Sequence, residues 1–204
     1  MGSMADNENK ILAIMLHGVG SNGADMMGLA EVLSPALPNV DFVAPDAPSP
    51  ADFGQGRAWF SIAGVTTENR PARIEAVRPG FDALIEGILA EKGYADRLDR
   101  VVLIGFSQGS MMTLDAVASG RWPVAAAIAF SGRLATNAPF TVSSTKLLLL
   151  HGDADPVVPV QETLRANEML GAAGFDVAHQ IFPNLGHSIS GDGIKRAVAF
   201  LSAL

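Results

Sequence analysis

Ser107 lies in a pentapeptide whose residue types suit nucleophilic catalysis. The segment Gly105-Phe106-Ser107-Gln108-Gly109 follows the apolar run Val101-Val102-Leu103-Ile104 and leads into a helical pattern. A sharp turn between a strand and a helix lifts a serine hydroxyl clear of a sheet, and flanking glycines avoid the clash that side chains would cause there. The pattern predicts a nucleophile elbow. The simpler interpretation makes Ser107 a helix N-cap after a strand.

Two aspartates, Asp153 and Asp155, follow another apolar run and precede Pro156. A carboxylate on a rigid turn at a strand end can hold an imidazole in one tautomer and stabilise its charged form. Either aspartate could do this, and at least one of them is expected only to shape the turn.

Four histidines are available as a base. His187 follows Gly186 in a loop between the last predicted strand and the last predicted helix, where an imidazole can reach over a neighbouring strand end. The chain order serine, aspartate, histidine is that of α/β-hydrolases. His17 and His151 each precede a glycine at a strand end and are assigned to turns, and His179 is assigned to one face of a strand.

A glycine-rich segment supports a different class of enzyme. Gly18-Val19-Gly20-Ser21-Asn22-Gly23 matches G-x-G-x-x-G, and Asp46 follows at a spacing (46 − 23 = 23) that suits the ribose of a nicotinamide dinucleotide. This oxidoreductase alternative explains one end of the chain only. In the hydrolase interpretation the same loop turns a backbone N–H toward the oxyanion of a tetrahedral intermediate, and Gln108, the residue after the serine, supplies a second N–H.

Composition narrows the class of protein. The chain of 204 residues is 49% hydrophobic, has a formal net charge of −7 and contains no cysteine. That length and composition favour one folded domain with a real core. The absence of cysteine excludes thiolate chemistry and disulfides, and the acidic balance without basic clusters disfavours nucleic acid and membrane surfaces. No cofactor or metal ion is expected.

The amino terminus gives no sign of a targeting signal. Residues 1–10 are polar and acidic rather than a basic stretch leading into an apolar one. We expect this segment to be disordered or left over from cloning, and residues 11–204 to form a single domain. No apolar run is long enough to span a bilayer, so a cytoplasmic protein without stable membrane anchoring is expected. The oligomeric state is open between monomer and homodimer.

Short apolar runs alternate with longer amphipathic stretches along the chain, which is typical of an α/β fold with a mostly parallel sheet and helices on both faces. The expected strands are residues 11–16, 40–44, 100–106, 124–130, 146–151 and 177–182. The expected helices are residues 24–37, 73–92, 108–119, 160–173 and 193–204, with Gly93 and Gly174 as helix stops. Residues 48–71 break this rhythm, and a loop of that length is often functional.

These segments together resemble the phospholipase/carboxylesterase family, whose members include small carboxylesterases and acyl-protein thioesterases of the α/β-hydrolase fold. The resemblance runs from about residue 11 to the end of the chain. It rests on the glycine loop after His17, the Trp59-Phe60 pair, the serine pentapeptide, the segment from His151 to Pro159, and Gly186-His187. Ser110 and Ser61 depart from the thioesterase pattern, which usually has glycine and aspartate there.

The resemblance implies Ser107 as nucleophile, Asp155 as triad acid and His187 as base. It also implies an oxyanion hole formed by the N–H groups of Val19 and Gln108. A final set of residues, in the long loop, is expected to wall the substrate site: Phe53, Trp59 and Phe60.

The expected activity is hydrolysis of short to medium acyl esters through an acyl-enzyme, with lysophospholipids and thioesters as further candidates. The expected architecture has no separate lid domain. Two alternatives remain: the nicotinamide-dependent oxidoreductase built on the Gly18 to Gly23 loop, and a hydrolase-fold receptor without catalysis.

Overall fold

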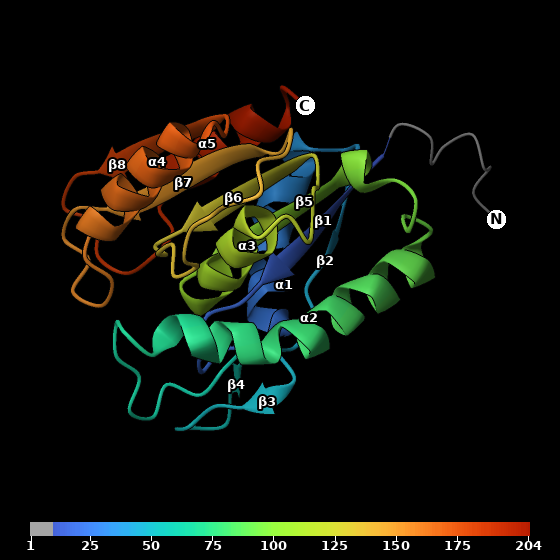
Figure 1. Cartoon of the computed structure of the whole chain (residues 1–204). Coiled ribbons are helices and arrows are strands. Elements are labelled where there is room, and N and C mark those ends of the chain that lie inside the picture. The colour runs from blue at the N-terminus through green and yellow to red at the C-terminus, as the bar shows by residue number, and fades with distance from the viewer. Residues whose placement is uncertain (1–9) are drawn as a thin grey trace.

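A computed structural model describes residues 10–204, in which six strands form one parallel sheet (Figure 1). The strand order is β2-β1-β5-β6-β7-β8, and every neighbouring pair is parallel. The strands are β1 (Ile11–Leu16), β2 (Val40–Val43), β5 (Val101–Phe106), β6 (Ala126–Phe130), β7 (Lys146–Gly152) and β8 (Val177–Phe182). Because all six run the same way, their carboxyl ends meet at one edge, where ligands of open α/β sheets bind.

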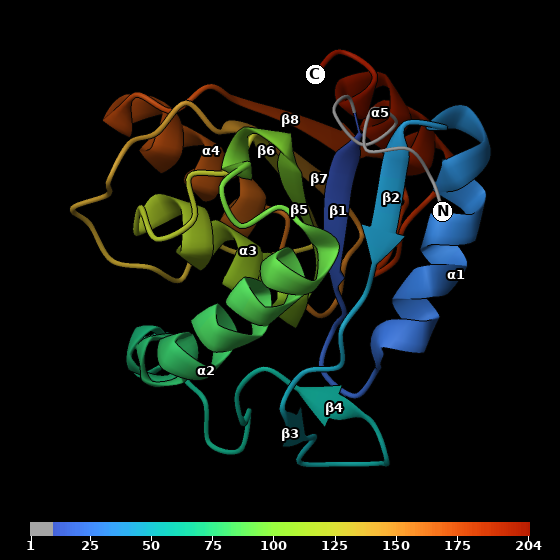
Figure 2. The same ribbon diagram turned by 90° about the vertical axis from the view of Figure 1, so that its right-hand side faces the viewer.

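Helices cover both faces of the sheet, as Figure 2 shows. Three helices lie on one face: α2 (Arg70–Lys92), α3 (Gln108–Ala118) and α4 (Gln161–Ala173). The other face carries α1 (Gly23–Leu33) and α5 (Gly191–Leu201), and a short 3-10 turn, Ser34–Ala36, follows α1. The predicted α/β class with a parallel sheet and helices on both faces is therefore confirmed.

The sheet separates two apolar cores because successive strand side chains point to opposite faces. Leu103 belongs to the core under α2, α3 and α4, whereas Val102 and Ile104 belong to the core under α1 and α5. Burial on both faces explains why the central strands are continuous apolar runs in the sequence.

The long segment at residues 48–71 is partly ordered by its own backbone pairing. It contains an antiparallel hairpin of β3 (Ser49–Pro50) and β4 (Arg57–Ala58). Helix α2 begins at Arg70 rather than at residue 73, because Pro71 is compatible with the first turn of a helix. Gly93 and Gly174 end α2 and α4 in the left-handed conformation, with φ of 77° and 106°, as predicted.

Two expectations concern the chain ends and the bilayer. Apart from Lys10, whose ammonium pairs with Asp41 at 2.8 Å, the segment expected to be disordered lies outside the described residues. No helix within residues 10–204 combines the length and the apolar character needed to cross a membrane.

Candidate active site

Ser107 occupies a strained turn between β5 and α3. Its backbone has φ 53° and ψ −113°, a conformation that residues other than glycine rarely adopt. The Ser107 N–H donates to the Phe130 carbonyl on β6 at 2.9 Å, which holds the turn against the sheet. A side chain at Gly105 or Gly109 would collide with neighbouring backbone. The local sequence therefore folds as a nucleophile elbow requires.

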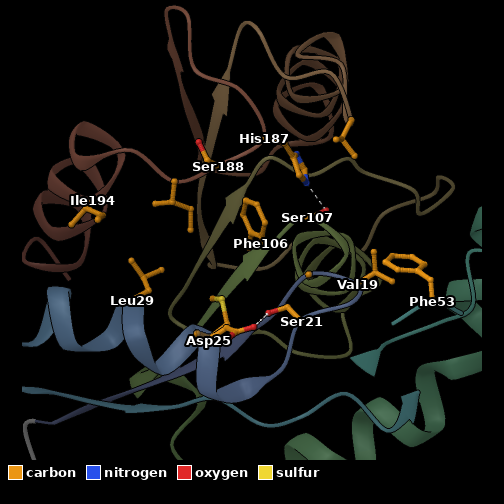
Figure 3. A pocket seen from close by; sticks show the side chains of 14 residues that line it. Val19, Ser21, Asp25, Leu29, Phe53, Phe106, Ser107, His187, Ser188 and Ile194 are labelled. Atoms are coloured by element: carbon orange, nitrogen blue, oxygen red, sulfur yellow. Dashed lines mark hydrogen bonds between the residues drawn. The ribbon is translucent and has the colours of Figure 1, made fainter. Parts of the chain in front are cut away.

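Three side chains from separate strand ends form a continuous hydrogen-bonded chain, and Figure 3 shows its link between Ser107 and His187. The Ser107 Oγ lies 2.9 Å from His187 Nε2, and His187 Nδ1 lies 2.7 Å from Asp155 Oδ2. Because a carboxylate only accepts, the Nδ1–H donates to Asp155 and Nε2 accepts from the serine hydroxyl. This is the arrangement in which an imidazole can remove the serine proton.

Asp155 is held by several donors at a buried position. Its Oδ1 accepts from the N–H groups of Val157 and Val158, at 2.8 and 2.9 Å, and its side chain is 0% exposed. Burial acts to raise the pKa of Asp155, but the hydrogen bonds from His187 and the two backbone groups outweigh it and the pKa lies below its usual value. Asp155 is therefore ionised at neutral pH.

The other aspartate of this turn, Asp153, is exposed and has a different partner. Its Oδ1 accepts from the Asn184 N–H at 2.6 Å, and its own N–H donates to the Phe182 carbonyl at 3.0 Å. Asp153 thus ties the β7 turn to the loop that carries His187. Of the two sequence candidates, only Asp155 contacts the imidazole.

The glycine loop after β1 and the start of α3 converge beside Ser107. Val19 and Ser107 line the same cavity, and the Gln108 N–H begins α3, where no preceding helical turn supplies an acceptor. The Gln108 side chain accepts from the Trp59 N–H at 2.8 Å and donates to the Phe60 carbonyl at 2.7 Å. The Trp59 Nε1–H donates to the His17 carbonyl at 2.9 Å. The Trp59-Phe60 segment therefore holds both the loop after β1 and the start of α3.

The prediction that Trp59 and Phe60 wall the substrate site needs correction. Trp59 is 1% and Phe60 4% exposed, and neither lines the cavity at Ser107. The hydrogen bonds with Gln108 and His17 draw this pair into the core under α2, where the Trp59 ring packs edge-on to Phe81. Phe53, in contrast, does line the cavity and covers Gly20.

The cavity at Ser107 and His187 has a volume of about 590 Å³. In Figure 3, Phe53 and Val19 lie to one side of Ser107, and Leu29 and Ile194 lie to the other. Apart from Phe53, the large apolar lining residues were not among the predicted pocket residues: Leu29, Phe106, Val157, Ile189 and Ile194. Met26 and Leu29 are three residues apart and therefore share one face of α1, and both line the cavity. This spacing is the sequence signal that could have identified α1 as a wall of the cavity.

Of the three remaining histidines, two are buried with hydrogen-bond partners and one is exposed. His17 is buried, with Nδ1 2.7 Å from the Gly18 carbonyl and Nε2 accepting from the Ala47 N–H at 3.0 Å. His151 is also buried, between Thr163 and Val158, and His179 is exposed on β8. These placements agree with the turn and strand roles predicted from the sequence.

Asp46, the residue that the dinucleotide alternative needs, is engaged within the fold. Its Oδ1 accepts from the Gly23 N–H at 2.8 Å, at the amino end of α1 where that alternative places a pyrophosphate. The carboxylate would repel such a group. No group of three or more histidine, aspartate or glutamate side chains suited to a metal ion occurs among the residues that the structure describes.

The fold and this site define an α/β-hydrolase, and comparison with known proteins identifies the family. The model of the phospholipase/carboxylesterase family matches residues 3–204, so the chain belongs to that family. It is 32% identical to esterase YpfH of Escherichia coli, over 96% of this chain and 84% of that protein. It is 31% identical to acyl-protein thioesterase 1 of Mycosarcoma maydis, over 91% of this chain and 88% of that protein.

Solved structures agree with this assignment. The crystal structure of esterase PE8 superimposes with a TM-score of 0.86 and 36% identity, over 95% of this chain and 92% of that one. SOBER1 of Arabidopsis thaliana superimposes with a TM-score of 0.79 at 23% identity, over 95% of this chain and 98% of that one, which supports the fold. The protein is therefore an enzyme, a serine hydrolase of the esterase and thioesterase type.

Proposed function

We propose that the protein is a carboxylesterase that hydrolyses short to medium acyl esters through an acyl-enzyme on Ser107. The observation that carries this proposal is the chain from Ser107 through His187 to Asp155 at the wall of an apolar cavity. His187 removes the serine proton as Oγ attacks the ester carbonyl, and Asp155 stabilises the imidazolium. The alcohol leaves with the proton from His187, and water then repeats the cycle on the acyl group.

The proposed oxyanion hole consists of the N–H groups of Val19 and Gln108. Both N–H groups belong to backbone that is held in place before substrate arrives. The loop that contains Val19 is held by the hydrogen bond from the Trp59 ring to the His17 carbonyl, and Gln108 is held by the hydrogen bonds of its side chain with Trp59 and Phe60. Donors that need no rearrangement stabilise developing charge most effectively.

The two sides of the cavity suit the two halves of an ester. Leu29 and Ile194 are half-buried and form an apolar side for the acyl chain, with the buried Met26 beside them. Phe53 is 54% exposed on the other side, which leaves an open route for the alcohol. Thioesters are further candidate substrates because one relative is named an acyl-protein thioesterase, and lysophospholipids are candidates because the family is described as phospholipase/carboxylesterase. The proposed setting is the cytoplasm, as a monomer or homodimer.

The test is turnover of a ladder of p-nitrophenyl esters and matching thioesters. Ser107→Ala is expected to lower kcat by about 10⁶-fold and Asp155→Asn by about 10⁴-fold, as in other triads, whereas Asp153→Asn stays within about threefold. A wild-type protein no faster than Ser107→Ala would support the non-catalytic receptor. Loss of kcat only in Asp153→Asn would show that the triad acid is misassigned.

A further inference from the structure

A second cavity, of about 150 Å³, opens among arginines that catalysis does not use. Arg70 starts α2, Arg133 lies in the loop after β6, and Arg165 lies on α4. Its lining shares no residue with the cavity at Ser107.

The charges around this cavity are unbalanced. Glu162 is the one acidic residue of its lining, against the guanidinium groups of Arg70, Arg133 and Arg165. The Glu162 carboxylate lies 3.4 Å from Arg133 Nη1 and 3.6 Å from Arg165 Nη2, and it cannot neutralise more than one of them. Among the lining residues, three positive charges and one negative charge leave an excess of two, in a chain whose formal net charge is −7. Outside the lining, the Glu68 carboxylate also acts on Arg70.

Two of the three arginines have donor groups without acceptors, whereas Arg165 Nη2 donates to the Leu134 carbonyl at 3.0 Å. Arg133 Nε is buried without a hydrogen-bond partner, and the Arg70 guanidinium has no ion pair or hydrogen bond within residues 10–204. Burial first, and the positive charge of Arg133 second, lower the pKa of Arg70. Three like charges that share a single carboxylate, Glu162, still repel one another, and an anion between them would relieve that repulsion.

We propose that this cavity binds a small dianionic oxyanion, either free phosphate or the phosphate group of a monoester. The local excess of two positive charges matches a dianion, and guanidinium groups donate in a fork that fits phosphate oxygens. Arg70 and Arg133 are the principal ligands, and Arg165 adds charge at the rim. The proposal does not depend on the hydrolase mechanism, so Ser107→Ala protein is suitable for the test.

The test is isothermal titration calorimetry with inorganic phosphate, glycerol phosphate and acetate, at constant ionic strength and about pH 8, where a phosphate monoester carries two charges. Arg70→Gln and Arg133→Gln are each expected to weaken phosphate binding about tenfold or more. Glu162→Gln is expected to tighten it, because a competing carboxylate is lost. Arg100→Gln, at the amino end of β5 on the other edge of the sheet, is the matched control and leaves binding unchanged.

Preference for inorganic phosphate over glycerol phosphate would identify the free ion as the ligand, and the reverse would identify a monoester. No binding of either by the wild-type chain overturns the proposal, as does acetate binding as tightly as phosphate. Equal weakening by Arg100→Gln also overturns it. Arg70 has no partner to lose, so Arg70→Gln remains informative even if melting curves show that Arg133→Gln disturbs the fold.

Discussion

His151 Nε2 lies 3.2 Å from Asp155 Oδ2, the carboxylate oxygen that also accepts from His187. The same Nε2 is 2.8 Å from the Val158 carbonyl, so both of its neighbours are acceptors and Nε2 carries the proton. Nδ1 then accepts from the Thr163 hydroxyl at 2.7 Å. His151 is therefore a neutral donor behind the carboxylate that faces His187.

We predict that His151 positions Asp155. His151→Asn retains an acceptor for Thr163 but loses the donor to Asp155, and its kcat/KM is expected to fall about tenfold. His151→Gln retains a donor near Nε2 and is expected to stay within about threefold. Without that donor the Asp155 carboxylate is held less firmly against His187, so the loss in His151→Asn is expected in kcat rather than in KM.

Melting curves of both variants serve as the control for folding. Equal losses of kcat in the two variants would show that His151 acts only through packing.

Backbone strain at Ser107 predicts a stability effect separate from catalysis. At φ 53° a glycine is far less strained than a residue that has a Cβ atom. Ser107→Gly is therefore expected to increase the free energy of unfolding by about 1 kcal/mol relative to Ser107→Ala, although both variants lack the hydroxyl. Urea unfolding of the two proteins measures the difference, and equal stabilities would contradict the strained conformation.

The two buried histidines predict a pH dependence of stability. Burial lowers the pKa values of His17 and His151 below their ordinary value of 6.5 in the folded chain. Below pH 6.5 the unfolded chain therefore binds more protons than the folded chain, so stability is retained above pH 6.5 and lost progressively as the pH falls toward the folded-state values. Urea titrations between about pH 8 and 5 test this.

Variants of the two buried histidines test the cause of that pH dependence. His17→Gln and His151→Gln are each expected to flatten the wild-type curve of unfolding free energy against pH. A wild-type free energy of unfolding that stays constant down to about pH 5 would contradict the prediction.

The acyl side of the cavity predicts a change of chain-length preference. Ile194→Trp fills the space beside Leu29, so kcat/KM for an octanoyl ester is expected to fall about tenfold or more. The kcat/KM for the acetyl ester is expected to stay within about threefold of the wild-type value. Phe53→Trp, on the opposite side of Ser107, is the matched control and should not discriminate by acyl length. Equal losses for short and long esters with Ile194→Trp would contradict the proposed acyl side.

The strand ends and the elbow were predictable because local sequence determines them. The apolar run at Ile11–Leu16 stops at polar and glycine residues, and its bounds match the predicted strand. The flanking glycines of the Ser107 turn are required by contacts within the turn and with the end of β1. Asp155 and Asp153 could not be separated by spacing, since the choice depends on where the His187 loop folds back.

The walls of the cavity were less predictable because they depend on packing between distant elements. Leu29 and Ile194 belong to helices far apart in the chain that lie on the same face of the sheet. Trp59 and Phe60 belong to a segment without periodicity, so nothing local indicates which way their rings point. Hydrogen bonds with Gln108 and His17 determine that they enter the core.

The most direct test of the central claim is labelling with a fluorophosphonate, followed by mass spectrometry of the digested protein. A serine activated by an imidazole is expected to form a covalent adduct, so wild-type protein should carry one phosphonyl group at Ser107. His187→Ala should label at least about a hundredfold more slowly, because the base is gone. Modification at another residue, or equal labelling of Ser107→Ala, would contradict the assignment of Ser107 as the nucleophile.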